Sequence, residues 1–451
     1  MKLMMVSLGC DKNLVDTEMM LAALRDDGFE FTDDESQAEV IVVNTCCFIG
    51  DAKEESINTL IDLGRYKQEG RLKCLIATGC LAQRYHDEIK EQLPEVDAVV
   101  GTMAIDSIAK AVKDALENTG SKEYLEDISR TVCGMPRIVS TGGHFAYLKI
   151  AEGCDKHCTY CVIPRVRGNY RSFPMETLVK EAGDLAAKGV KELILVAQET
   201  SLYGTDLYGK KALPKLVEKL SAIEGIYWIR LLYCYPEEIT DEIAAMFADN
   251  KKLLPYIDIP IQHSCDRILK LMGRNTGNAQ LKEKIALLRR YRPDICIRTT
   301  IIAGFPSETE EEVNELADFI EEQRFDRLGV FTYSREEQTP AADFSDQIDE
   351  REKEKRRGYL MEVQQDIAFE KAAAMRDKEL IVMIEGRIED QGTYVGRSYM
   401  DAPGIDGMVF VETSKNLMTG DFIRVHITGS YEYDLVGVPL DEYGTSDPGE
   451  V

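Results

Sequence analysis

The sequence predicts an α/β protein of about three domains: an N-terminal parallel α/β domain, a partial (β/α)6 barrel, and a small antiparallel β-barrel at the C-terminal end. Three observations support this prediction. The chain has 451 residues, which is too long for one ordinary core. Strand-like and helix-like segments alternate through two long stretches. After Lys378 the pattern changes to short strands with glycine-rich turns. We place the domains at residues 1–117, 140–370 and 373–440.

The predicted strands of the first domain share one kind of ending. Three of them end in Gly or Thr followed by a cysteine and a fourth does not: Lys2–Cys10, Val40–Cys46, Leu72–Cys80 and Val96–Gly101. Helical patterns lie between them, at Asp16–Asp27 and Lys53–Gln68. Strands that alternate with helices form parallel sheets, and ligands gather at the carboxyl edge of such sheets. We therefore expect Cys10, Cys46 and Cys80 to converge on one metal centre.

The twelve cysteines of the chain are more typical of metal ligands and core residues than of disulfides in a cytoplasmic protein. Cys47 is expected to point away from the metal centre, although the sequence leaves open which of Cys46 and Cys47 is the ligand. Cys74 lies within a strand and is expected in the core. Four further cysteines belong to no spaced cluster and are expected to be structural: Cys133, Cys234, Cys265 and Cys296.

The second alternating stretch predicts most of a barrel. Its six candidate strands are Ala146–Ile150, Glu192–Val196, Trp228–Leu232, Tyr256–Ile259, Ile295–Ile302 and Arg327–Thr332. A barrel of this kind carries its site at the carboxyl ends of its strands. A charged helix, Asp349–Arg376, follows. The β module then has predicted strands at Lys378–Gly386, Gly407–Val411 and Phe422–Ser430. The acidic tail Asp441–Val451 is predicted to be disordered.

The strongest chemical signal is a C-x3-C-x2-C triplet, Cys154, Cys158 and Cys161, directly after a predicted strand. Three thiolates within eight residues can hold three irons of a cubane cluster and leave the fourth iron open. A structural zinc site is the main alternative, but such sites usually close with four ligands. His157 is available, yet its position inside the loop differs from the spacing of an ordinary zinc finger.

The segment Gly153–Cys161 resembles the motif of the radical SAM superfamily. This resemblance implies that Cys154, Cys158 and Cys161 bind a 4Fe–4S cluster whose open iron holds S-adenosylmethionine (SAM). Reduction then cleaves SAM to methionine and a 5′-deoxyadenosyl radical. Tyr160 matches the position that packs against the adenine, and a core aromatic is its alternative role.

Four more residues are expected to contact SAM. Gln198 and Thr200 lie at the end of a barrel strand, on the side that faces cofactor or substrate. Gly304 and Pro306 lie on a loop that borders the SAM site in the radical SAM family that the chain resembles. A helix cap is the alternative role for a polar residue at the strand end, and a turn with a helix start is the alternative for the glycine–proline loop.

The resemblance to methylthiotransferases spans nearly the whole chain. Six further segments carry it: Ser7–Glu18, Asn44–Ile49, Ala77–Cys80, Ala197–Gly204, Ile259–Ser264 and Arg298–Thr309. The resemblance identifies the β module as a TRAM domain. It implies that Cys10, Cys46 and Cys80 bind a second 4Fe–4S cluster. One SAM would methylate a sulfur held there, and a radical from a second SAM would remove a substrate hydrogen before the carbon takes up the methylthio group.

Two branches of this family differ in substrate. One modifies an adenosine of tRNA and the other the β-carbon of an aspartate of small-subunit ribosomal protein 12. The opening Ser7–Asp16 and the segment Gly396–Gly407 resemble the protein-modifying branch. Residues 371–440 contain seven Lys and Arg against eleven Asp and Glu, a net charge of −4. An acidic module suits a basic ribosomal protein better than RNA, so we expect the protein substrate, with tRNA as the alternative.

The chain departs from the family pattern at four loop positions. Asp11, Thr17, Ser307 and Gln338 stand where a proline, a serine and two glycines are usual. None of these changes removes a predicted ligand, so they affect loop detail and not the expected reaction.

Composition limits the location and the partners. The net charge is −26, no apolar run reaches the roughly 18 residues of a membrane helix, and the apolar start is too short for a signal core. We expect a cytoplasmic enzyme, with no membrane partner, that uses a reductant such as flavodoxin or ferredoxin. The alternative from another class is a non-catalytic iron–sulfur or zinc protein that binds through its β module.

Overall fold

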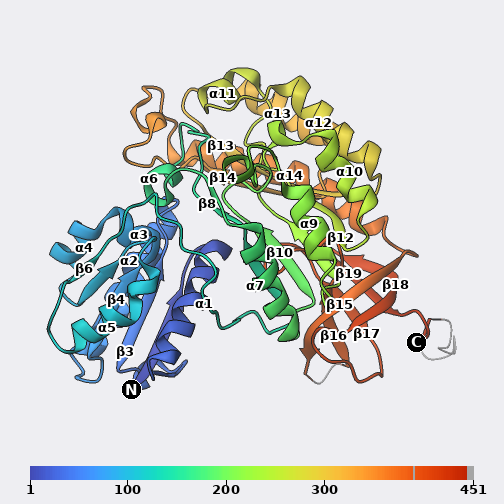
Figure 1. Cartoon of the computed structure of the whole chain (residues 1–451). Coiled ribbons are helices and arrows are strands. Elements are labelled where there is room, and N and C mark those ends of the chain that lie inside the picture. Colours follow the sequence, from blue (N-terminus) through green and yellow to red (C-terminus); the bar gives the residue numbers. More distant parts are fainter. Residues whose placement is uncertain (390–391, 444–451) are drawn as a thin grey trace.

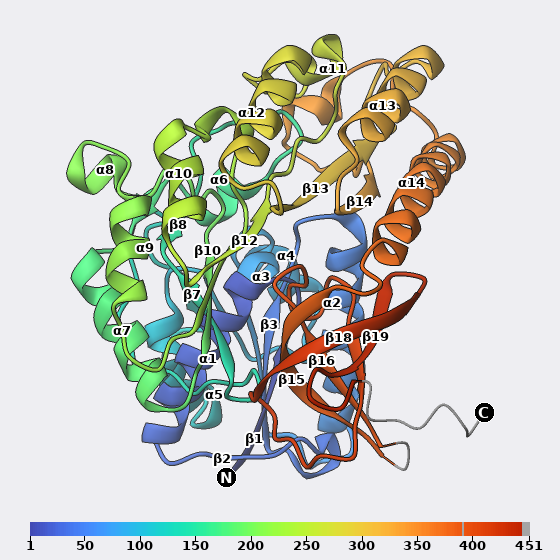
Figure 2. The same cartoon turned by 90° about the vertical axis from the view of Figure 1, so that its right-hand side faces the viewer.

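The structure is a computed structural model, and it describes residues 1–389 and 392–443. Residues 444–451 of the tail predicted to be disordered lie outside the described residues. The N-terminal domain and the C-terminal β module lie on opposite sides of the central barrel strands (Figure 1). A second view shows the β module in front of strands that belong to the first domain (Figure 2).

The first domain is a parallel sheet with helices on both faces. Its strand order is β2-β1-β3-β4-β5-β6, with strands β1 Lys2–Ser7, β2 Glu30–Phe31, β3 Val40–Thr45, β4 Cys74–Thr78, β5 Ala98–Val100 and β6 Glu123–Tyr124. Its helices are α1 Asp11–Asp26, α2 Gly50–Gly64, α3 Gly79–Arg84, α4 His86–Gln92 and α5 Ile108–Leu116. Alternate strand residues pack against α2, α3 and α4 on one face and against α1 and α5 on the other. The strands are therefore apolar throughout.

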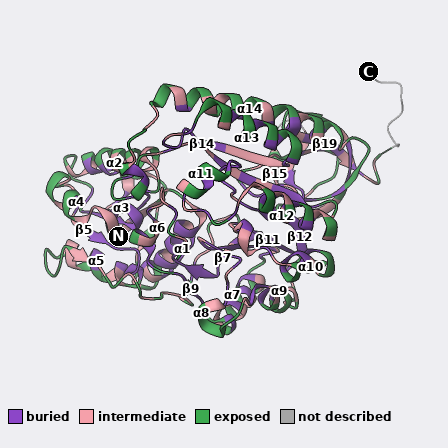
Figure 3. Ribbon diagram, turned by 90° about the horizontal axis from the view of Figure 1, so that it is seen from above, coloured by how far each residue is buried: buried purple, intermediate pink, exposed green. Residues whose placement is uncertain are grey.

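Helix α1 begins five residues before the predicted start at Asp16. Cys10 has an extended backbone and occupies the N-cap position, and Asp11 lies in the first turn. An acidic side chain in the first turn interacts favourably with the helix dipole. The early turn is buried because α1 lies between the first sheet and the barrel (Figure 3). Because no local sequence pattern reports this contact between domains, the prediction placed the start of the helix too late.

The second domain is an open parallel sheet of six strands, as predicted. In the order β14-β13-β12-β11-β10-β7, these are Arg327–Thr332, Cys296–Ala303, Leu253–Asp258, Trp228–Leu231, Glu192–Val196 and Phe145–Lys149. A short antiparallel pair stands beside it: β8 Ala151–Glu152 and β9 Arg171–Ser172. Both open edges are covered, since α1 packs against β7 and α14 packs against β14. Covering an edge strand protects it from pairing with another chain.

The helices of this domain surround the outer face of the sheet, where Leu193 and Leu195 of β10 pack among them. They are α6 Ile163–Arg167, α7 Met175–Ala187, α8 Thr205–Tyr208, α9 Leu213–Ser221, α10 Asp241–Asp249, α11 Asp266–Leu271, α12 Asn278–Tyr291, α13 Glu310–Gln323 and α14 Glu350–Ala373. Short 3-10 helices lie at Glu35–Gln37, Arg65–Lys67, Ile105–Ser107, Pro236–Glu238 and Pro340–Asp343.

The C-terminal module is a closed five-stranded barrel, which confirms the predicted small β-barrel. Its strands, in the order β15-β16-β17-β19-β18, are Glu379–Ile388, Thr393–Arg397, Val409–Glu412, Asp434–Pro439 and Phe422–Tyr431. The pair β17–β19 is parallel and the other pairs are antiparallel. Closure removes the unpaired edges that an open sheet of this size would expose.

This module fills the inner side of the open barrel. Inward-facing Ile194 and Tyr256 share an apolar cluster with Met383 and Ala402 of the module. Polar contacts join the same surfaces: Arg397 and Arg230 each lie 2.8 Å from the Glu192 carboxylate, Arg327 lies 2.6 Å from Asp401, and the Tyr256 hydroxyl donates to Asp406 at 2.7 Å. The module therefore completes the core that six strands leave open.

None of the helices within the described residues combines the length and apolar character needed to cross a membrane.

Glu192 is expected to control docking of the β module. Glu192→Gln leaves the buried guanidinium of Arg230 without its counter-charge and Arg397 with Glu385 alone, and breaking such a buried pair costs about 3–5 kcal/mol. The single tryptophan, Trp228, reports the change because its ring lies 4.8 Å from that of Phe422 in the module. Urea unfolding followed by tryptophan emission should give a lower midpoint for this variant.

The matched control is Glu218→Gln, since Glu218 pairs with Lys215 and both side chains are more than half exposed. Its midpoint should stay near that of the parent chain. Equal midpoints for the two variants would show that Glu192 does not hold the module in place.

Candidate functional site

The first cysteine trio lies at the carboxyl edge of the N-terminal sheet. Cys10 is the N-cap of α1, Cys46 directly follows β3, and Cys80 lies in the first turn of α3. Gly9 lets the first two loops approach closely, because it has φ +86° and a Cβ there would lie 2.8 Å from the Cys46 sulfur. Cys10 and Cys80 therefore both lie at helix N-termini, and Cys46 lies in the loop between them at the same sheet edge.

Burial governs the protonation of Cys46 and Cys80. Burial first, and then the neighbouring Cys80 and Cys10 sulfurs, raise the pKa of Cys46 to about 12. Burial also raises the pKa of Cys80, while the Arg167 guanidinium acts to lower it. Buried thiols that repel each other as thiolates need a cationic centre to ionise together. The donor set therefore fits a metal cluster.

The second cysteine trio lies on the loop between β8 and α6. The loop turns sharply at Gly153, which has φ +76° and whose added Cβ would lie 2.1 Å from the Asn169 carbonyl oxygen. Burial raises the pKa of Cys154 to about 12, and it raises the pKa of Cys161, as do the Cys158 and Cys154 sulfurs. The Tyr235 hydroxyl lies 3.6 Å from the Cys158 sulfur.

The spacing of the sulfurs distinguishes a cluster from a single zinc ion. Within the described residues, the one group of at least three possible ligand atoms that all lie within 4.8 Å of one another is His86, Asp87 and Glu123. Neither cysteine trio is that compact. Zn–S bonds of about 2.3 Å in a tetrahedron place the sulfurs about 3.8 Å apart. The wider trios therefore suit a polynuclear cluster better than a mononuclear zinc site.

The residues expected at the SAM site have different surroundings. Tyr160 is half-buried and packs against a cluster that contains Phe305 and Tyr333. The Gln198 amide donates to Glu152 at 2.8 Å, and its buried Oε1 has no hydrogen-bond partner among the described residues. The Thr200 hydroxyl donates to the Tyr233 carbonyl at 2.7 Å, so it joins two strand ends.

The loop with Gly304 and Pro306 is buried against α14. Gly304 has φ +73°, and a Cβ there would lie 2.3 Å from Lys353 of that helix. Its N–H donates to Glu308 at 2.9 Å. These contacts give Gly304 a packing role, and its contact with SAM stays a prediction, as does that of Pro306.

The other cysteines lie away from both trios or within the core. Cys47 and Cys74 are fully buried in the two cores that flank the first sheet. The remaining ones are all free, and three of the four are buried: Cys133, Cys234, Cys265 and Cys296.

Sequence patterns did not single out several buried polar residues near the second trio. Burial raises the pKa of Glu199 to about 7, and its Oε2 has no hydrogen-bond partner among the described residues. The Arg274 guanidinium lies 4.2 Å from the centre of the Tyr235 ring and 4.0 Å from the Cys158 sulfur. Glu199 stands inside a motif quoted above, whereas no local pattern marks Arg274.

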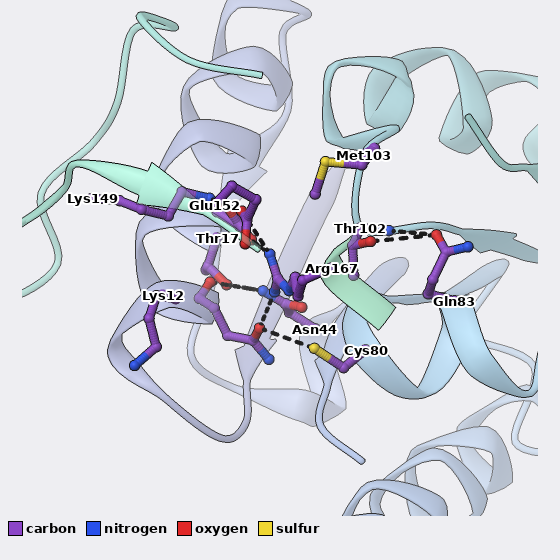
Figure 4. A network of polar contacts seen from close by, with 12 residues as sticks. Lys12, Thr17, Asn44, Cys80, Gln83, Thr102, Met103, Lys149, Glu152 and Arg167 are labelled. Atoms are coloured by element: carbon purple, nitrogen blue, oxygen red, sulfur yellow. Dashed lines mark hydrogen bonds and ion pairs between the residues drawn. The ribbon is translucent and has the colours of Figure 1, made fainter. Parts of the chain in front are cut away.

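A buried polar network joins the first two domains beside Cys80 of the first trio (Figure 4). Arg167 of α6 lies 2.7 Å from Asp16 and 3.2 Å from Glu152, and it also donates to Asn13 of α1. The Asn13 side chain in turn lies 3.7 Å from the Cys80 sulfur. The side chains of Arg167, Asp16 and Glu152 are each 2% exposed.

Lys149 and Glu152 complete this network from the barrel. The Lys149 ammonium contacts Asp16 and lies 2.8 Å from Glu152. Burial acts to raise the pKa of Glu152, but Lys149 and Arg167 hold it well below its usual value. Two cations thus balance two carboxylates, and Glu152 stands two residues before Cys154. The network therefore holds the strand that leads into the second trio against helix α1, which begins directly after Cys10.

A second contact between α1 and the barrel lies in the first turn of the helix, directly after Cys10. The Asp11 carboxylate is 2.8 Å from the Lys12 ammonium and accepts a hydrogen bond from the Tyr233 hydroxyl at 3.2 Å. The ammonium lies 3.3 Å from the centre of the Tyr233 ring. Tyr233 follows β11, so this contact is at the carboxyl end of the barrel strands and beside the first trio.

Comparison with known proteins accounts for all three domains. Residues 2–101 match the uncharacterized protein family UPF0004, residues 148–320 match the radical SAM superfamily, and residues 378–440 match the TRAM domain. The ribosomal protein uS12 methylthiotransferase RimO of Lachnoclostridium phytofermentans is 55% identical over 442 residues, which are 97% of this chain and 99% of the relative. The chain belongs to the RimO family of radical SAM methylthiotransferases.

Other RimO proteins show the same full-length similarity. The protein of Thermoanaerobacter sp. is 49% identical over 96% of this chain and 98% of its own length. That of Clostridioides difficile is 48% identical over 98% of this chain and 99% of its own length. The family assignment therefore covers the cysteine loops, the barrel and the β module together.

Solved structures share the fold at low sequence identity. The radical S-adenosylmethionine methyltransferase TsrM from Kitasatospora setae has a TM-score of 0.55 at 15% identity, over 75% of this chain and 76% of that chain. The cobalamin-dependent S-adenosylmethionine radical enzyme OxsB has a TM-score of 0.53 at 16% identity, over 76% and 54%. These likenesses support the arrangement of the domains in this RimO-family chain.

Arg167 is expected to stabilise the junction of the first two domains. Arg167→Met leaves Asp16 and Glu152 with Lys149 alone, so one negative charge is buried without a partner. Removing one member of a buried ion pair costs about 3–5 kcal/mol. Urea unfolding followed by circular dichroism should show that loss.

The matched control on the same helix is Arg165→Met, because Arg165 is exposed and should change stability by less than about 0.5 kcal/mol. The double variant Arg167→Met with Glu152→Gln restores charge balance and should recover part of the loss. An equal effect of the two single arginine variants would show that the network contributes nothing to the junction.

Proposed function

We propose that this chain is a radical SAM methylthiotransferase that adds a methylthio group to the β-carbon of an aspartate of ribosomal protein uS12. The observation that carries the proposal is the presence of two cysteine trios, one on each of two domains that a buried network joins. Full-length similarity to RimO proteins supports the choice of substrate over tRNA. The proposed location of the protein is the cytoplasm, where its ribosomal substrate is made.

Each trio has its own task in this proposal. Cys154, Cys158 and Cys161 hold a 4Fe–4S cluster that binds SAM through its open iron, and Cys10, Cys46 and Cys80 hold a second one. When bound, these groups supply the radical that removes the β-hydrogen and the methylthio group that replaces it. Such a C–H bond is too unreactive for a side-chain base, so the hard chemistry belongs to the cofactors.

The protein's own residues bind and orient. Tyr160 and Gln198 are proposed to contact SAM. Tyr160 directly precedes Cys161 of the second trio, and the buried Oε1 of Gln198 has no hydrogen-bond partner among the described residues. Gly304, Pro306 and Thr200 are proposed to shape the walls of that site. A flavodoxin-type or ferredoxin-type protein is the proposed electron donor.

Charge supports a basic protein as substrate. The whole chain has a net charge of −26, which attracts a basic partner at long range. In the β module, Arg424 pairs with Glu379, Lys415 pairs with Asp441, and Arg397 is buried. Arg376, Lys378 and Arg387 are exposed, so the preference for a basic protein rests on the net negative charge of the module and of the whole chain.

Iron content tests the two trios separately. Cys154→Ala and Cys10→Ala should each remove about half of the iron and sulfide of the reconstituted chain, because each trio holds one cluster of equal size. Cys133→Ala is the control, since Cys133 is a partly exposed free thiol outside both trios, and its iron content should match the parent. Full iron in either trio variant would remove that trio from the proposal.

The intact mass of uS12 tests the reaction. In a host that lacks its own modifying enzyme, the parent chain should add the mass of one methylthio group to uS12, and both Cys154→Ala and Cys10→Ala should abolish the gain. An unchanged uS12 mass, with a soluble and iron-loaded enzyme, would contradict the proposal. A methylthio nucleoside in the tRNA of the same cells would then identify the other substrate class.

A further inference from the structure

The Asp11 carboxylate, one residue after Cys10, is buried between Lys12 and Tyr233, and we call these two donors the carboxylate pocket. The Asp11 carboxylate lies between the Lys12 ammonium at 2.8 Å and the Tyr233 hydroxyl at 3.2 Å. The side chains of Asp11 and Lys12 are 7% and 8% exposed. The two donors come from different domains, because Lys12 is in α1 and Tyr233 follows strand β11 of the barrel.

Only one of the two Asp11 carboxylate oxygens is paired in this pocket. Asp11 Oδ1 takes the contacts from Lys12 and Tyr233, whereas the buried Oδ2 has no hydrogen-bond partner among the described residues. Leaving a buried charged oxygen unpaired is costly. The ammonium has three donors, and one contact to Asp11 leaves the others for a second acceptor.

The pocket wall is held in a strained conformation. Tyr233 has φ +59°, which is rare for a bulky residue. Its N–H donates to Asp258 at 3.1 Å and its carbonyl accepts from Thr200, so the ends of two neighbouring strands fix it. Strain of this kind persists where the surroundings impose it, and it clusters at ligand sites.

We propose that Lys12 and Tyr233 form the pocket for the side-chain carboxylate of the substrate aspartate, and that Asp11 occupies this pocket until the substrate displaces it. The inference rests on the proposed function. An aspartate side chain is what the pocket now holds, and the proposed substrate residue is also an aspartate.

The position of the pocket suits this role. It lies beside Cys10, on the side of the barrel mouth where Asp258 and Arg298 also meet. The β-carbon of aspartate is directly bonded to its carboxyl carbon, so a held carboxylate fixes the carbon that reacts. Fixing a reactive carbon in this way reduces the entropy that the reaction must otherwise lose. Lys12 and Tyr233 are thus specificity-determining residues that contact the substrate.

Binding without turnover tests the pocket. The iron-loaded enzyme, with SAM and no reductant, is titrated with labelled uS12 that carries either the target aspartate or asparagine in its place. Lys12→Gln should weaken binding of the aspartate form by roughly tenfold to a hundredfold, because a hydrogen bond to a charged group contributes about 1.5–3 kcal/mol. Binding of the asparagine form should stay unchanged.

Three further variants sharpen the test. Tyr233→Phe removes only the hydroxyl and should weaken the aspartate form selectively but less. Asp11→Asn removes the competing carboxylate and should strengthen binding of the aspartate form. Lys180→Gln is the matched control, since Lys180 is 79% exposed and pairs only with Asp184, and it should change neither form.

The outcomes separate this inference from the proposed function. If the parent enzyme adds a methylthio group to uS12, but Lys12→Gln keeps the same preference for aspartate over asparagine, the pocket assignment is wrong. If Lys12→Gln fails to bind iron, Tyr233→Phe decides, because it leaves the Lys12 ammonium in place. Weaker binding of the aspartate form alone then supports the pocket, and unchanged binding of that form contradicts it. If the parent enzyme leaves uS12 unmodified, the proposed function itself fails.

Discussion

The junction between the first two domains depends on the guanidinium of Arg167, which belongs to the barrel domain and is bound by Asp16 and Asn13 of α1. A buried guanidinium is stable only when its donors are satisfied, so the two domains meet in the one arrangement that supplies all the partners. Asn13 contacts Cys80, and Glu152 stands two residues before Cys154. One charge network therefore joins the helix that follows Cys10 to the strand that precedes Cys154.

The open barrel imposes the second constraint. A six-stranded sheet leaves its inner face and its two edges uncovered, and three different parts of the chain cover them. Helix α1 covers β7, α14 covers β14, and the β module fills the inner side through Glu192, Arg397 and Asp406. The carboxyl ends of the strands are left for the cysteine loops and for the pocket of Lys12 and Tyr233. The site therefore lies at the carboxyl ends of the strands, because the edges and the inner face of the sheet are already covered.

Sequence patterns predicted the fold because they report local physics. Alternation of apolar strands with helices predicted both parallel sheets, and glycine-rich turns predicted the β-barrel. Position at strand ends singled out Cys10, Cys46 and Cys80, which the structure places at one edge. Patterns were less informative for Thr200 and Gly304, which contact a strand end and α14 in the structure. A polar residue at a strand end looks the same in sequence whether it binds a ligand or the backbone.

The sequence by itself determined the order of the domains, the strands and the two sets of thiols, because each of these depends on residues close together in the chain. Only the tertiary structure decided which distant groups meet. Asp11 and Tyr233 are separated by 222 positions and Asn13 and Arg167 by 154, yet each pair is in hydrogen-bond contact. Such contacts are fixed by the packing of α1 against β7, since burial of charged groups requires partners that no local pattern specifies.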